Sequence, residues 1–217
     1  MRKVKVTALA GSLASLALFA SVAGAALIKG TPNNDVLSGT PNADVIRALA
    51  GNDTITAGDG PDRVRAGKGD DGATGDAGND IVLGGHGNDR LAGGTGNDRV
   101  HGGSGDDTVS GSEDNDRVGG GRGNDTVNGD GGNDNLFGGF GADTVNGSDG
   151  NDRLHALAPD GNPDVLNCGP GQDVAFIRAS EKATTTTDGQ CERIKFVRVI
   201  TEDQRNGENA DTDAQAE

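Results

Sequence analysis

The sequence predicts an all-β repeat protein in which short strands alternate with glycine-rich turns. A nine-residue period runs without a break from residue 30 to residue 155, with an Asp at the same place in every copy and, in all but one, a larger aliphatic residue two places later. Composition supports this class, because the 217 residues include 39 Gly and only 2% aromatic residues. So few large apolar side chains exclude a conventional hydrophobic core.

The N-terminal segment, residues 1–25, differs from the rest of the chain and predicts a signal peptide. Basic residues at positions 2, 3 and 5 precede an apolar stretch, and Ala23-Gly24-Ala25 offers the small residues of a cleavage site. A membrane anchor is the alternative, and it is disfavoured because Gly and Ser dilute a short apolar run. We therefore expect a secreted, extracellular protein without integral membrane association.

The repeat begins at Gly30 and gives fourteen copies, whose residues we number from position 1 to position 9. Position 8 is Val, Leu or Ile in thirteen copies, and position 4 is Gly in eleven. Position 6 is Asp in all fourteen, namely Asp35, Asp44, Asp53, Asp62, Asp71, Asp80, Asp89, Asp98, Asp107, Asp116, Asp125, Asp134, Asp143 and Asp152. A lone Asp would be read as a turn former, but fourteen in phase indicate metal ligands.

Positions 7 to 9 predict one three-residue strand per copy, with the aliphatic residue inward and its two neighbours outward, as in Thr108-Val109-Ser110. One buried side chain per copy cannot offset the ordering of a glycine-rich turn, which costs about 1 to 2 kcal/mol per residue. Gly can turn carbonyl oxygens inward beside the Asp carboxylate, and such hard oxygen ligands suit Ca²⁺. The spacing therefore predicts calcium as the metal, held by the position-6 Asp residues.

The repeat resembles the haemolysin-type calcium-binding repeat of RTX proteins, with the consensus G-G-x-G-x-D-x-U-x. The copy over residues 84–92, GGHGNDRLA, fits it in full, and the resemblance covers residues 30–155. It implies a parallel β-roll, a β-solenoid with two nonapeptides per turn, so that fourteen copies make seven turns. Several Ca²⁺ ions, at most about 12, would lie between loops stacked from copy n to copy n+2. The copies at Gly30 and Gly39 lack Gly at positions 2 and 4, so full sites are expected from Gly75 to Asp152.

Residues 156–200 predict degenerate repeats and a C-terminal cap, after a phase slip of three residues. The two cysteines of an exported chain most simply pair, which predicts a disulfide between Cys168 and Cys191 that closes the open end of the roll. The Cys-Gly-x-Gly-x-Asp to Cys-Glu arrangement resembles the ends of repeat proteins exported by actinobacteria. Residues 201–217 are polar and acidic and predict a disordered tail.

No enzyme is expected, because the sequence holds no H-E-x-x-H, G-x-S-x-G or P-loop motif and leaves too few residues outside the repeats for a catalytic domain. We interpret His86, His101 and His155 as solvated surface, and Asn at position 5 as turn chemistry. The net charge of −15, without Trp or Tyr, argues against nucleic acid as a partner.

The main functional hypothesis is a monomeric, secreted, non-enzymatic calcium-binding protein whose roll folds when Ca²⁺ binds. The alternative is a calcium-dependent adhesin or surface-recognition module. Its outward residues, Thr54/Thr56, Thr108/Ser110, Thr126/Asn128 and Thr144/Asn146, could present a flat face to the cell envelope, polysaccharide or ice.

Overall fold

The computed structural model describes residues 24–180 and 185–197, in which every regular element is a β-strand. The predicted signal peptide falls on residues 1–25 and the predicted tail on residues 201–217, so both lie almost wholly outside the described residues. Within the described part of the chain, no helix is long and apolar enough to span a membrane.

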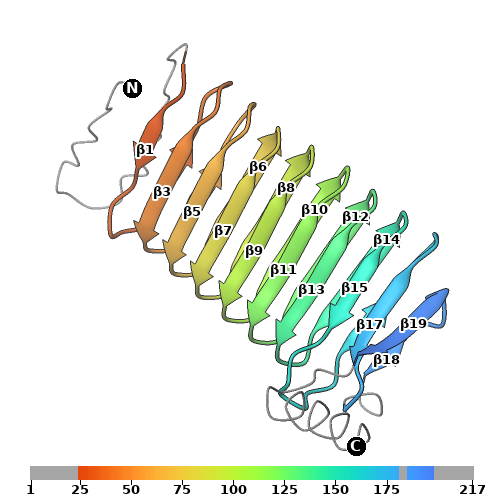
Figure 1. The fold of residues 1–217 in the computed structure, drawn as a ribbon. Helices are drawn as coiled ribbons and strands as arrows, with labels where there is room; N and C mark the ends of the chain where they lie inside the picture. The colour runs from red at the N-terminus through yellow and green to blue at the C-terminus, as the bar shows by residue number, and fades with distance from the viewer. Residues whose placement is uncertain (1–23, 181–184, 198–217) are drawn as a thin grey trace, which may run out of the picture.

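The strands form two parallel sheets that the chain visits in turn, and the roll is elongated along one axis (Figure 1). The ten-stranded sheet contains β1 (Leu27–Lys29), β3 (Val45–Ala50), β5 (Arg63–Lys68), β7 (Ile81–His86), β9 (Arg99–Ser104), β11 (Arg117–Arg122), β13 (Asn135–Phe140), β15 (Arg153–Ala156), β17 (Val174–Arg178) and β19 (Arg193–Val197). The nine-stranded sheet contains β2 (Val36–Ser38), β4 (Thr54–Thr56), β6 (Gly72–Ala77), β8 (Arg90–Thr95), β10 (Thr108–Glu113), β12 (Thr126–Gly131), β14 (Thr144–Asp149), β16 (Val165–Asn167) and β18 (Thr186–Thr187). Each turn of the chain therefore uses two nonapeptides, which confirms the parallel β-roll.

The core consists mainly of the position-8 side chains, which stack in register along the roll, with Ala48, Ala57 and Ala66 at position 1. Val109 pairs with Leu91 on one side and with Val127 on the other, an offset of 18 residues in each direction. Val109 and Val127 are completely buried. Each strand thus buries its aliphatic residue against the same position one turn away, and the core is narrow and continuous.

Most strands in the repeat region are six residues long, so the expectation of three-residue strands is wrong for these copies. The strand continues through positions 1 to 3 of the next copy, as in β9, where Gly102 at position 1 is buried. Gly103 at position 2 has φ of 124°, a conformation that Gly adopts readily. These glycines therefore lie in the strands and not in the turn, and their lack of side chains lets the backbone keep its pairing while it bends.

The roll has about nine turns rather than seven, because strands outside the fourteen copies extend both sheets. At the start, β1 pairs with β3 in parallel through Ile28 and Ile46. At the other end, Val165 of β16 pairs with Thr144, an offset of 21 residues. The loop before β16 therefore absorbs the three-residue slip, and the degenerate repeats keep their place in the fold.

The disulfide between Cys168 and Cys191 is present, with an S–S distance of 1.99 Å and 5.2 Å between the Cα atoms, as predicted. It joins the segment after β16 to the segment before β19, and Cys168 is completely buried. Asp188 lies beside the two sulfur atoms, but the disulfide leaves no thiolate there to bind a metal. The bond therefore fastens the last strands to the roll.

Candidate metal-binding loops

The position-6 Asp residues form two ladders, one along each edge of the roll. In each rung, a backbone N–H donates to Oδ1 of the Asp one turn later, for example from Asp80 to Asp98 at 2.7 Å and from Asp98 to Asp116 at 2.7 Å. One ladder runs through Asp35, Asp53, Asp71, Asp89, Asp107, Asp125, Asp143 and Asp164. The other runs through Asp44, Asp62, Asp80, Asp98, Asp116, Asp134, Asp152 and Asp173.

The second carboxylate oxygen of most of these residues is buried and accepts no hydrogen bond. This holds for Oδ2 of Asp53, Asp62, Asp71, Asp80, Asp89, Asp98, Asp107, Asp116, Asp125, Asp134, Asp143, Asp152 and Asp173. A buried carboxylate oxygen without a partner is costly unless a cation or a proton compensates it. Rows of such oxygens are hard ligands, and the donor set fits Ca²⁺.

The glycines at positions 2 and 4 bring the backbones of successive loops into close contact. Gly87 has φ of 115°, and a Cβ atom there would collide with the carbonyl oxygen of Gly69, the equivalent residue one turn earlier. Gly105 stands in the same relation to Gly87, with φ of 126°. Gly adopts this backbone angle at little cost and permits the close approach, so the carbonyl oxygens of these loops stack along the axis. Ser112 at position 2 and Asp114 at position 4 also have positive φ, of 89° and 75°.

The electrostatics of the metal-free loops oppose ionisation of the buried Asp residues. Burial is the main cause, and the carboxylates one turn away add to it, so the pKa of Asp62 and of Asp116 rises to about 7. The pKa of Asp98 rises to about 6 for the same reasons, with its hydrogen bond from the Asp80 N–H acting in the opposite direction. A calcium ion would supply the missing positive charge and favour the ionised form.

Asp35 and Asp44 differ from the other predicted ligands. Oδ2 of Asp35 accepts a hydrogen bond from the Thr31 N–H at 2.6 Å, and Oδ2 of Asp44 accepts one from the Thr40 N–H at 2.6 Å. The Thr-Pro-Asn loops of these copies thus satisfy their own carboxylates. The departure from the repeat predicted this difference at Gly30 and Gly39, whereas the copies with Asp53, Asp62 and Asp71 already have the geometry of the later ones.

The end of one ladder uses an acidic residue that the sequence did not reveal. Glu192 Oε2 accepts the N–H of Asp173 at 2.5 Å, so a Glu takes the place of the next Asp. Asp173 shares the geometry of the regular copies, although the predicted ligands do not include it. It follows Asp152 by 21 residues instead of 18, and the next two residues, Val174 and Ala175, pair with Arg153 and Leu154 at positions 7 and 8.

Most Asn and Asp residues at position 5 form hydrogen bonds from one turn to the next along both edges of the roll, outside the loops. This corrects the interpretation of Asn at position 5 as local turn chemistry. The N–H of Asn124 donates to Oδ1 of Asp106 at 2.8 Å, and the N–H of Asp106 donates to Oδ1 of Asn88 at 2.9 Å. These bonds join residues 18 apart, so the side chains tie one turn to the next.

His155 is not the solvated surface residue that we expected. It is stacked between Phe137 and Phe176, with ring centroids 4.4 Å and 4.6 Å away and nearly parallel planes. Burial, with help from nearby Arg117 and Arg153, lowers its pKa to about 4, so the ring is neutral at pH 7. His86 and His101 are exposed, as predicted.

The structure therefore defines a parallel β-solenoid with stacked acidic, glycine-rich loops on its two edges. The model of the RTX calcium-binding nonapeptide repeat, which spans four copies, matches six overlapping segments between residues 29 and 154. The chain belongs to this family, whose repeats bind Ca²⁺, and its stacked, buried Asp residues fit that ion. No curated protein matches the chain.

Proposed function

We propose that this protein is a secreted, non-enzymatic calcium-binding protein whose roll folds when Ca²⁺ binds between the stacked loops. The ions would be held by the position-6 Asp residues, from Asp53 to Asp152, together with Asp173. Asp35 and Asp44 are weaker candidates because threonines already satisfy their second oxygens. The number of ions is several, within the limit of about 12 that the loop count allows.

The observation that carries this proposal is the row of buried Oδ2 atoms without hydrogen-bond partners. Their burial is costly in the metal-free state, and the small aliphatic core offers little to offset that cost. Calcium binding would convert the cost into a gain, because each ion neutralises carboxylates that otherwise raise one another's pKa. Metal binding then becomes part of the free energy of folding.

Secretion is supported by the disulfide, which persists in oxidising compartments, and by the sequence before the roll. The backbone nitrogen of Ala26 lies 2.5 Å from Oδ1 of Asp44. Cleavage after Ala25 would convert that nitrogen into a charged amine beside the carboxylate. The predicted cleavage point thus coincides with the place where a new N-terminus would be stabilised.

A non-enzymatic role is supported by the positions of the buried ionisable groups. The buried Asp residues belong to the loop ladders, and the ring nitrogen Nε2 of His155 is held by Oδ1 of Asn135 at 2.8 Å. These buried groups therefore hold successive turns of the roll together, which supports a structural role for them. We propose the adhesin role as the second candidate, because the outward Thr and Asn residues named above all lie on the nine-stranded sheet and form one polar face.

Far-ultraviolet circular dichroism during a calcium titration tests the main proposal. The secreted chain, residues 26–217, is stripped of metal with a chelator and titrated with Ca²⁺, with Mg²⁺ as the control. We expect a cooperative rise in β-structure with Ca²⁺ and none with Mg²⁺, which rarely gives up its water to such a site. An unchanged spectrum up to about 10 mM Ca²⁺ would contradict the proposal.

A further inference from the structure

The two sheets of the roll carry opposite charge patterns, although the chain as a whole is acidic. The described residues contain thirteen Lys and Arg residues, of which only Arg90 lies in the nine-stranded sheet. The other twelve lie in strands of the ten-stranded sheet, and those strands contain no Asp or Glu. The nine-stranded sheet, in contrast, contains Asp76, Glu113, Asp130 and Asp149.

The outer surface of the ten-stranded sheet, which we name the basic face, presents most of its cations at the outward positions 7 and 9, with Lys68 and Arg122 at position 3. Arg63, Arg99, Arg117 and Arg153 share position 7 and are exposed, while the position-8 residues between the outward positions are buried. Arg99 and Arg117 are neighbours in the strand register of β9 and β11. Because the strands of this sheet hold no carboxylate, these guanidinium groups lack acidic neighbours within the face, and their charges reinforce one another.

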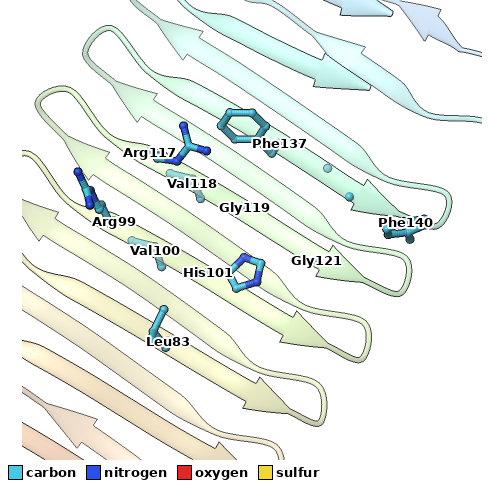
Figure 2. Close-up of a pocket in the computed structure, with 12 residues that line it drawn as sticks. Leu83, Arg99, Val100, His101, Arg117, Val118, Gly119, Gly121, Phe137 and Phe140 are labelled. Carbon is cyan, nitrogen blue, oxygen red and sulfur yellow. The ribbon is translucent and has the colours of Figure 1, made fainter. Parts of the chain in front are cut away.

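A hollow of about 360 Å³ lies near the middle of the basic face, where Gly119 leaves a gap in the column of outward side chains. On either side, the position-9 residues in register with Gly119 are His101 and Phe137. Arg99, Arg117 and Phe140 also line the hollow, and Figure 2 shows these side chains around Gly119. The Arg117 guanidinium carbon lies 4.3 Å from the centroid of the Phe137 ring, so one of the cations is already positioned by packing.

We propose that the basic face is a docking surface for an anionic polysaccharide and that the hollow at Gly119 receives one of its acidic sugar units. Guanidinium groups pair with carboxylates and sulfates, and the exposed ring of Phe140 adds apolar surface for the sugar. The exposed cations recur along the roll, which suits an extended chain with repeating negative charge. The inference rests on the proposed function, because the face exists only in the folded roll.

The charge pattern alone would also suit nucleic acid or an anionic membrane, and the surface chemistry favours neither. Phe137 has Arg117 over one face and His155 stacked on the other, so its faces are not open for base stacking. The large exposed apolar residues of the sheet include Leu27 and Leu49 near one end of the roll and Ile194 and Phe196 at the other. They are too dispersed to form an apolar patch that would insert into a bilayer.

The test uses the calcium-loaded chain with three probes of the same backbone, namely carboxymethyl dextran, dextran sulfate and neutral dextran. We expect binding to the two charged polymers, none to dextran, and a steep loss of affinity between 50 and 300 mM NaCl, because exposed ion pairs are screened. Equal binding to neutral dextran, or an affinity that does not change with salt concentration, would overturn the proposal. Tighter binding to duplex DNA or to phosphatidylglycerol vesicles than to both charged dextrans would reject the polysaccharide assignment.

Matched single substitutions locate the site. Arg99→Gln removes a charge at the hollow, and Arg90→Gln removes the same charge from the opposite sheet. We expect the first to weaken binding to carboxymethyl dextran about fivefold and the second by less than about twofold. Equal losses from both variants would show that binding follows net charge and not the basic face, and would contradict the proposal.

A third variant, Gly119→Phe, fills the hollow without changing charge. A Cβ atom at Gly119 would lie 3.1 Å from Nδ1 of His101, whose side chain is exposed and can move aside. The backbone of Gly119 does not have a positive φ, so a side chain there causes no backbone strain. We expect its loss of affinity to match that of Arg99→Gln. Circular dichroism of each sample separates the two proposals. A folded roll that does not bind the polymers overturns only the docking surface. A chain that stays unfolded in calcium overturns both proposals.

Discussion

In the regular copies, the two carboxylate oxygens of the position-6 Asp have different surroundings, and we propose a different role for each. In Asp107, Oδ1 accepts the N–H of Asp89 at 2.8 Å and so fixes the loop one turn earlier. Oδ2 is buried without a hydrogen-bond partner and lies where a side chain at Gly102 would stand. The Asp at position 6 therefore favours a small residue at position 1 of the same copy, because a side chain at Gly102 would collide with Oδ2.

Replacing Asp107 with Asn separates these two roles. The amide oxygen can still accept the Asp89 N–H, while the negative charge is lost. We expect Asp107→Asn to raise the calcium concentration at the folding midpoint and to lower the number of bound ions by one or two, because a ligand charge is missing. Calorimetric calcium titration measures both. An unchanged midpoint and ion count would contradict a ligand role for Asp107.

Asp35→Asn is the matched control for that change. Its Oδ2 already accepts hydrogen bonds from Thr31, and its Oδ1 accepts one from the Thr31 hydroxyl at 3.1 Å. We expect a smaller change in calcium stoichiometry than for Asp107→Asn. A larger change would indicate that calcium displaces the threonine.

Most glycines at position 4 should tolerate a side chain poorly, although Asp114 occupies this position with φ of 75°. Gly105 has φ of 126°, and its Cβ would meet the carbonyl oxygen of Gly87 and Oδ1 of Asn88. We expect Gly105→Ala to lower the free energy of unfolding in saturating calcium by about 1 to 3 kcal/mol. Gly72→Ala, at a position with open space around it, should change it by less than about 1 kcal/mol. Thermal unfolding compares the two, and equal effects would argue against the close loop contact.

At the scale of the strands, in-register parallel pairing turns a repeated residue into a stacked column. Phe137, His155 and Phe176 lie at the same outward position of β13, β15 and β17, and their centroid spacings of 4.4 and 4.6 Å are close to the distance between strands. Arg117 and Lys195 lie over the two ends of this column. The periodicity could have predicted the stack, because the first two rings are 18 residues apart.

The disulfide-linked end of the roll should be the element most sensitive to reduction. The bond closes a separation of 23 residues, which contributes about 3 kcal/mol in the chain-entropy treatment. We expect the double substitution Cys168→Ser/Cys191→Ser to increase hydrogen exchange in β17 and β19 while β9 and β11 keep their protection. The calcium transition of the repeat region should persist. Uniform loss of protection along the roll would show that the cap controls the folding of the whole molecule.

At the scale of the whole molecule, the period of the sequence predicted short strands with one inward aliphatic residue each, and the resemblance of the repeat to the RTX family implied the parallel roll with two nonapeptides per turn. Calcium was expected from the same repeat, and the Asp residues at position 6 are its proposed ligands. The number of turns did not follow from the period, since β1 and β16 to β19 lie outside the clean repeats and depend on pairing with a neighbouring turn.

Net charge was the least informative property of the sequence. It is acidic overall, and it concealed the gathering of Arg residues on one sheet. The alternation of copies between two sheets creates that asymmetry, because Arg63, Arg99, Arg117 and Arg153 are separated by even numbers of copies. Assigning alternate copies to opposite faces before summing the charge would have revealed it.

Acid should partly replace calcium in stabilising the metal-free roll. In the folded, metal-free chain the pKa of Asp62, Asp89 and Asp116 rises from 3.8 to about 7, chiefly through burial. The folded state therefore binds more protons than the unfolded state between about pH 4 and pH 7, and the free energy of unfolding falls as the pH rises through that range.

We accordingly expect the chelator-treated protein to gain β-structure when the pH is lowered from 7.5 to 5, measured by circular dichroism. His155 opposes this trend, because its lowered pKa of about 4 means that its stabilising contribution is lost as the pH falls from 6.5 towards 4. The many Asp residues should outweigh one His down to about pH 5. In calcium the dependence should reverse, with the calcium midpoint rising as protons compete for the same oxygens. A metal-free chain that loses structure on acidification would show that the buried carboxylates do not limit its folding.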